Sequence, residues 1–166
     1  AGALSRRARH ARLEPPMPTA TSPSLSSDGA RAVLRISLGA ILLTHGLPKL
    51  LHTAHGAMAD PMANSIRLIR DGAGLPFAEQ LAVLVMLIET AGAVLLMLGL
   101  GTRAVACAIC AEMIGIAWVL GPTWPWLERG IEYPVLMGAV ALSIVLSGGG
   151  AWSLDALWIR RRQAAA

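Results

Sequence analysis

Six ionisable residues stand inside long apolar stretches of this sequence, and their types could carry acid–base chemistry. A charged side chain near the centre of a bilayer costs at least ~2.5–3.5 kcal/mol on insertion scales, so each needs a partner or a function. Carboxylates and imidazole can accept and return protons, and a lysine can neutralise a carboxylate. The six residues are Arg35, His45, Lys49, Glu89, Glu112 and Glu132.

The spacing of these residues predicts a polar pocket. Arg35, His45 and Lys49 recur on one stripe of a helix, so His45 and Lys49 are neighbours that face the same way. At ~1.5 Å rise per residue they lie toward the outer surface, near the start of the helix that carries Glu132. We predict that His45 and Lys49 meet Glu132 and Glu89 in an outward-facing pocket.

Two interpretations of such a pocket remain open. In the first, the charges only neutralise one another and fix the register of the helices. In the second, the pocket binds a small redox molecule such as a quinol, whose oxidation releases protons that a carboxylate or imidazole accepts. Glu112, near mid-membrane, has no obvious cationic partner.

The elements that carry these residues are four apolar segments. With 55% hydrophobic residues and a mean hydropathy of +0.59, the 166-residue chain is too apolar for a typical soluble domain. Each segment approaches the ~20 residues needed to cross ~30 Å of hydrocarbon. We predict an all-α fold, an integral membrane four-helix bundle, with helices at about 30–51, 78–100, 103–121 and 132–147.

Small residues favour close packing of these helices. A stripe on the fourth segment recurs at spacings of three and four and is predicted to face the bundle. It consists of Glu132, Leu136, Ala139, Ser143 and Ser147.

Positive charge predicts the orientation. Arginines precede and begin the first segment, Arg103 lies between the second and third, and three more close the chain at 160–162. All fall on one side of a four-helix bundle, which the positive-inside rule assigns to the cytoplasm, so both termini are predicted to be cytoplasmic. The basic residues behind the net charge of +4 are therefore interpreted as topology signals, and we predict no nucleic-acid partner.

The regions outside the helices have distinct compositions. Residues 1–28 are basic and rich in proline and are predicted to be disordered. Residues 29–150 form the predicted membrane domain. Residues 151–166 place Trp152 and Trp158 beside arginines, as in a cytoplasmic tail that lies on the membrane surface.

Two further patterns carry weaker signals. Cys107 and Cys110 form a CxxC pair only a few residues from the predicted cytoplasmic turn, where small apolar filler is favoured over a redox role. A group of histidines and methionines follows the first helix and could suit copper, but it lacks a fixed geometry, and we predict no metal site. The group is His52, His55, Met58 and Met62.

Three stretches resemble the signature regions of DoxX-type membrane proteins. They read RISLGAILLTHGLPKL, IETAGAVLLMLGLGTRA and GIEYPVLMGAVALSIVLSGGGAWSLD, and they span about 31–157. Two residues depart from the pattern: Gly149 stands where many members have Pro, and Arg129 where many have Gly. The matching positions are Arg35, His45, Gly46, Lys49, Glu89, Gly92, Gly99, Arg103, Glu132, Gly148, Gly150, Ser153 and Asp155.

The resemblance implies a four-helix, multi-pass protein of the bacterial inner (cytoplasmic) membrane with a quinone link. The family takes its name from subunits associated with an archaeal terminal quinol oxidase and with thiosulfate:quinone oxidoreductase. Arg35, Arg103 and Asp155 are expected to serve structure or topology, and His45, Lys49, Glu89 and Glu132 to form the ligand pocket.

The leading functional prediction is an accessory or quinone-interacting subunit of a membrane redox system. The expected partners are the lipid bilayer and other membrane or redox-complex subunits. No covalently bound cofactor is expected; quinone is the expected ligand, and enzyme activity stays open. The alternatives are a non-catalytic anchor or assembly subunit and a transporter of a small molecule or ion.

Overall fold

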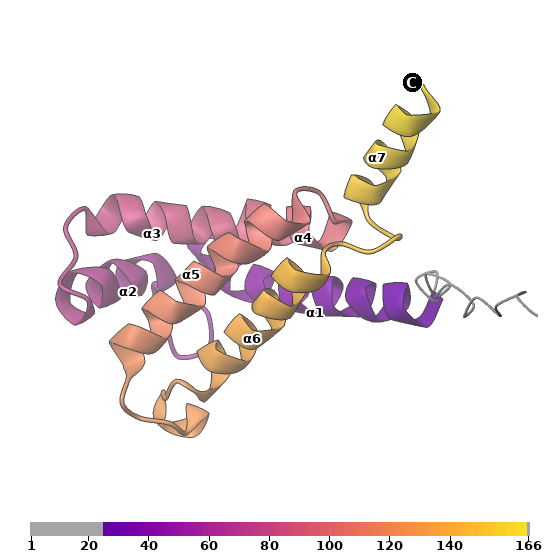
Figure 1. Ribbon diagram of the computed structural model, residues 1–166. Helices are drawn as coiled ribbons and strands as arrows, with labels where there is room; N and C mark the ends of the chain where they lie inside the picture. Colours follow the sequence, from indigo (N-terminus) through magenta and orange to yellow (C-terminus); the bar gives the residue numbers. More distant parts are fainter. Residues whose placement is uncertain (1–24, 166) are drawn as a thin grey trace, which may run out of the picture.

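The computed structural model describes residues 25–165, and this part of the chain is built from helices joined by turns and loops (Figure 1). A π-helical turn at Ile88–Gly92 joins α3 to α4 into one continuous rod, and another at Leu68–Gly72 extends α2. The α-helices are α1 (Leu25–Leu51), α2 (Pro61–Arg67), α3 (Ala78–Leu87), α4 (Ala93–Leu98), α5 (Thr102–Leu120), α6 (Glu132–Ser147) and α7 (Leu154–Ala164).

Apolar length shows which helices could cross a membrane. Ser27–Leu51, Ala78–Leu98 and Thr102–Leu120 are each long and apolar enough to cross a bilayer, and Glu132–Ser147 is a shorter apolar helix. These are the four predicted segments, with ends that differ from the predicted ones by only a few residues. The all-α prediction is confirmed for the described residues.

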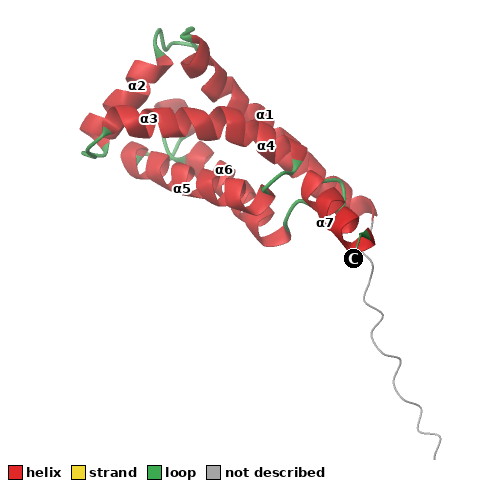
Figure 2. Ribbon diagram, turned by 90° about the horizontal axis from the view of Figure 1, so that it is seen from above, coloured by secondary structure: helices red, strands yellow, loops and turns green. Residues whose placement is uncertain are grey.

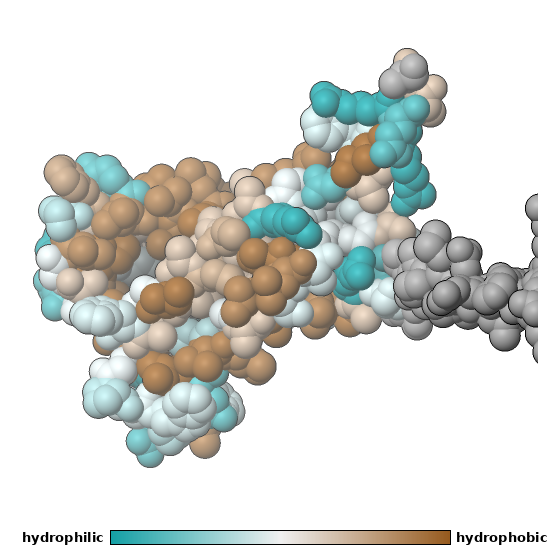
Figure 3. Space-filling view, in the orientation of Figure 1, coloured by the Kyte–Doolittle hydropathy of each residue, from teal (hydrophilic) through white to brown (hydrophobic). Residues whose placement is uncertain are grey.

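The four apolar helices pack as two antiparallel pairs, with the α3–α4 rod beside α1 and α5 beside α6 (Figures 1 and 2). A buried apolar core joins the pairs through Leu38, Leu42, Leu96, Ile109 and Ile144. Large apolar side chains also cover the outside of the helices (Figure 3), where lipid rather than water would solvate them. This surface supports a membrane location.

The predicted boundary of the N-terminal tail is wrong by several residues. Residues 25–28 are helical, and Asp28 fastens this turn to the bundle because its buried carboxylate accepts a hydrogen bond from the Ala151 N–H at 2.9 Å. The rest of the predicted disordered tail, residues 1–24, lies outside the described residues.

The predicted inward stripe of α6 is also wrong. All five of its residues, Glu132, Leu136, Ala139, Ser143 and Ser147, are exposed. The buried face carries Pro134, Met137, Ala141 and Ile144 instead. Ser147 needs no partner from another helix because its hydroxyl donates to the Ser143 carbonyl within α6, at 2.7 Å.

Candidate functional site

A buried ion pair joins α1 to the α3–α4 rod. The Nζ of Lys49, in the last turn of α1, lies 2.5 Å from an Oε of Glu89, in the π-helical turn. Lys49 is 8% exposed and Glu89 is 4% exposed. Each charge thus has the partner that its apolar surroundings require.

Local backbone features bring Glu89 to this position. A π-helical turn holds one extra residue compared with an α-helical turn, so it changes the direction of the side chains around it. Gly46 lets α1 approach closely, since a Cβ at this residue would lie 2.7 Å from the Glu89 carbonyl carbon and oxygen. The pair therefore depends on a glycine contact between two helices.

Glu112 of α5 is the third ionisable group of the site. Its side chain is buried, and neither carboxyl oxygen has a hydrogen-bond partner within the described residues. It lies close enough to Glu89 and Lys49 for their charges to interact. The Lys49–Glu89 pair thus adjoins a buried carboxyl group with free hydrogen-bonding capacity.

Aromatic rings form the more accessible side of the site. The rings of His45 and His55 meet edge to face with centroids 5.1 Å apart, and the Tyr133 ring lies 6.4 Å from His45. His45 and His55 are half-buried, whereas Tyr133 of α6 is 41% exposed. These rings carry hydrogen-bonding groups beside the surface of the bundle.

The polar cluster is therefore defined as Lys49, Glu89 and Glu112 inside, with His45, His55 and Tyr133 at its rim. The structure brings together three of the four residues predicted for the pocket, His45, Lys49 and Glu89. Sequence reasoning missed Glu112, His55 and Tyr133 as members. The mid-membrane depth shared by Glu89 and Glu112 was the available signal.

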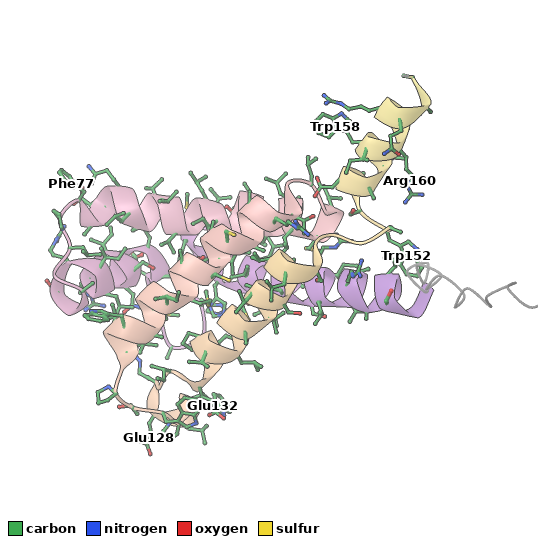
Figure 4. The ribbon with its side chains drawn as sticks, viewed as in Figure 1. Phe77, Glu128, Glu132, Trp152, Trp158 and Arg160 are labelled. Carbon is green, nitrogen blue, oxygen red and sulfur yellow. The ribbon has the colours of Figure 1, made fainter. Side chains whose placement is uncertain are left out.

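Glu132 does not join the Lys49 pair, which corrects the prediction for this residue. It is exposed at the start of α6, and its carboxylate accepts a hydrogen bond from the Trp126 N–H at 3.3 Å. Figure 4 shows it beside Glu128 in the loop region, far from Trp152 and Trp158. The loop before α6 folds back on itself, so that the Glu132 N–H donates to the Trp124 carbonyl and the Glu132 carboxylate lies next to the Trp126 amide.

The opposite end of the bundle holds the residues expected to be structural. Arg35 is 1% exposed and donates to the carbonyls of Leu96 at 3.1 Å, Met97 at 2.9 Å and Trp152 at 2.9 Å. It ties α1 to the end of α4 and to the segment that enters α7.

Asp155 completes this connection. It accepts hydrogen bonds from the Gly101 N–H at 2.8 Å and from the Thr102 N–H and hydroxyl at 2.9 and 2.8 Å. Burial raises the pKa of Asp155, but these bonds and the charge of Arg35 lower it further, so the pKa lies below its ordinary value. Arg103 makes a longer contact of 3.5 Å with the Leu146 carbonyl.

The two cysteines lie on α5 as free thiols. Cys107 is exposed on the helix surface, and the Cys110 thiol donates to the Gly138 carbonyl at 3.6 Å. Cys110 thus helps α5 pack against α6, and neither thiol is among the residues of the polar cluster.

Comparison with known families identifies the chain. A family model described as DoxX matches residues 30–122, which include the α1, α3–α4 and α5 portions of the polar cluster. The chain belongs to the DoxX family. The searches of curated proteins and of solved structures gave no match.

One departure from the DoxX pattern has a conformational consequence. Arg129 has a φ of 59°, in the left-handed region that favours glycine. Glycine, which the resemblance to DoxX proteins leads us to expect at this position, would adopt this conformation without steric cost.

Proposed function

We propose that this DoxX protein is a quinone-interacting subunit of a membrane redox system, and that the polar cluster is its ligand site. The observation that carries the proposal is Glu112, a buried carboxyl with no hydrogen-bond partner among the described residues, placed against an ion pair in an apolar bundle. A carboxyl in such a setting is suited to exchange a proton with a bound molecule.

The rim and the interior of the cluster have different roles in this proposal. A quinone ring approaches from the lipid, and its oxygens accept or donate hydrogen bonds at His45 and Tyr133. Oxidation of the quinol breaks two O–H bonds, and the imidazole of His45 and the Glu112 carboxylate accept the protons. The two electrons pass to a redox centre in a partner subunit.

The proposed orientation follows from charge. We place the α7 end of the bundle in the cytoplasm of a bacterial cell, with both chain termini inside, because arginines in the first half of α1, at the start of α5 and in α7 gather at that end. The polar cluster then lies in the outer half of the inner membrane.

The first experiment measures bound quinone. The protein is purified in mild detergent, and the quinone is extracted and quantified per protein molecule. We expect near-stoichiometric quinone in the wild type and clearly less in His45→Gln, because the loss of one hydrogen bond of about 1.4 kcal/mol lowers the affinity for quinone about tenfold. His52→Gln is the matched control, because His52 is exposed outside the cluster.

The second experiment follows the proton. Infrared difference spectra between oxidised and reduced quinone should contain a carboxyl C=O band that disappears in Glu112→Gln and persists in Glu128→Gln, an exposed control. Wild-type protein without quinone, or a carboxyl band unchanged by Glu112→Gln, would contradict the proposal. Isolation without quinone but in a stable membrane complex would instead favour an anchor subunit.

A further inference from the structure

The end of the bundle that carries α7 has a surplus of exposed positive charge. Three consecutive arginines, residues 160–162, are exposed on α7, and Figure 3 shows hydrophilic residues beside apolar ones on this helix. Nearby carboxylates are engaged inside the protein: Asp28 bonds Ala151 and Arg31, and Asp155 bonds the α4–α5 turn. None of the ion pairs among residues 25–165 involves the arginines of α7.

The three arginines are used differently. Arg160 donates to the Ala151 carbonyl at 2.6 Å, and the Arg162 guanidinium stacks 3.9 Å above the Trp158 ring centroid. Arg161 has neither a hydrogen bond nor an ion pair within the described part of the chain. Its guanidinium therefore remains available for an anion from outside the chain.

Arg161 lines a surface groove whose other walls are apolar. The groove lies between α7 and the α4–α5 turn and has a volume of about 270 Å³. Its lining residues are Leu100, Leu154, Leu157, Trp158 and Arg161. A cation beside apolar walls is complementary to an amphiphile with an anionic head and a hydrocarbon chain.

The position of α7 places this groove at the membrane surface. The helix is held at its start by Asp155, whose N–H donates to the Gly99 carbonyl at 2.9 Å, just beyond the end of α4. From there α7 runs across the direction of α1 (Figure 1), and it carries the labelled Trp158 of Figure 4. A helix with tryptophan and arginine at the end of a membrane bundle lies at the level of the lipid headgroups.

We propose that this groove binds an anionic phospholipid, with its phosphate on Arg161 and the upper part of an acyl chain against Leu100, Leu157 and Trp158. The inference is independent of quinone binding, because it concerns the opposite end of the bundle and rests on the charge and shape of the groove. It gives α7 a specific ligand in addition to a general affinity for the membrane surface.

The test is lipid binding to the full chain in detergent, measured by native mass spectrometry during titration with phosphatidylglycerol. Phosphatidylcholine with the same acyl chains is the lipid control. We expect Arg161→Gln to weaken phosphatidylglycerol binding about fivefold, the equivalent of ~1 kcal/mol for one arginine near the surface. Arg160→Gln removes the same charge from the same helix outside this groove and should weaken binding less.

Three outcomes would overturn the proposal. Equal weakening by Arg160→Gln and Arg161→Gln would indicate diffuse attraction without a site. Equal binding of phosphatidylcholine would remove the requirement for an anion. Binding of glycerol phosphate, which has no acyl chain, as tightly as phosphatidylglycerol would indicate an anion site without a role for the apolar walls. Arg161 is exposed, and size-exclusion chromatography of each variant verifies that it remains folded.

Discussion

The backbone of Glu89 occupies the space that a side chain at position 46 would need. A Cβ atom added to Gly46 would lie 2.7 Å from the Glu89 carbonyl oxygen. Gly46→Ala should therefore push α1 away from the π-helical turn and destabilise the protein by about 1–3 kcal/mol, as overpacking does. Denaturation in a detergent titration measures this change. Gly115→Ala is the matched control, because its Cβ would meet no atom within 4 Å. Equal stability of the two variants would contradict the close contact.

The Lys49–Glu89 pair should show strong energetic coupling. Lys49→Met leaves the Glu89 carboxylate buried without its partner, and breaking a buried pair in this way costs about 3–5 kcal/mol. Replacing both residues, as Lys49→Met with Glu89→Gln, should recover a large part of this loss. A double-mutant cycle of unfolding free energies measures the coupling. Additive losses would show that the two side chains act independently.

Much of the fold could be predicted because apolar length is a strong signal for membrane helices. The π-helical turn at Ile88–Gly92 could not, since one extra residue inside an apolar run leaves the composition unchanged. The buried face of α6 was misassigned because the helix is apolar on nearly all sides, so its sequence has no clear inward stripe. By contrast, α2 was not predicted although the sequence contains a signal for it. Asp60 before Pro61 is a typical helix start, and the Asp60 carboxylate accepts a hydrogen bond from the Ala63 N–H.

The sequence could predict the depth of the site residues along their helices, but not how each helix is rotated about its own axis. Lys49 and Glu89 could be paired because each needed a counter-charge. Whether Glu112 faces Glu89 depends on how α5 is rotated about its axis, which packing against α6 decides. Glu132 was misplaced because its local partner, the Trp126 N–H, is a backbone group that no sequence pattern reveals.

The proposed orientation can be tested by cysteine labelling in whole cells. In a background with Cys107 and Cys110 replaced by Ala, a cysteine is introduced by Ala59→Cys or Ala164→Cys, both at exposed positions at opposite ends of the bundle. We expect a membrane-impermeant maleimide to label the first variant in intact cells and the second only after lysis. The reverse pattern would invert the orientation.

Stability should depend on pH through Asp155. Its pKa is lower in the folded protein than in the unfolded chain, so its contribution is present above the unfolded value of about 3.9 and is lost as the pH falls through the folded value. Asp155→Asn should cost about 1–2 kcal/mol at neutral pH, and the difference from wild type should shrink below about pH 4. Thermal unfolding between neutral and acid pH measures this. Asp71→Asn, at an exposed position, should track the wild type; a similar profile for both variants would contradict the role of Asp155.

Replacing Arg35 by lysine should destabilise the protein although the substitution keeps the positive charge. Its planar guanidinium reaches the carbonyls of Leu96, Met97 and Trp152 from two separate nitrogens, whereas the ammonium of lysine is a single compact donor group on a differently shaped chain. Arg35→Lys leaves at least one of these carbonyls without its guanidinium donor, and we expect a loss of about 1–3 kcal/mol in the unfolding free energy. Arg67→Lys, at an exposed position on α2, is the control and should change stability by less than about 0.5 kcal/mol.

Because the Trp152 carbonyl precedes α7, Arg35→Lys should also make the peptide bonds after Trp152 more susceptible to protease while those of α2 are unchanged. Uniform protection at both sites would show that Arg35 does not hold α7 to the bundle.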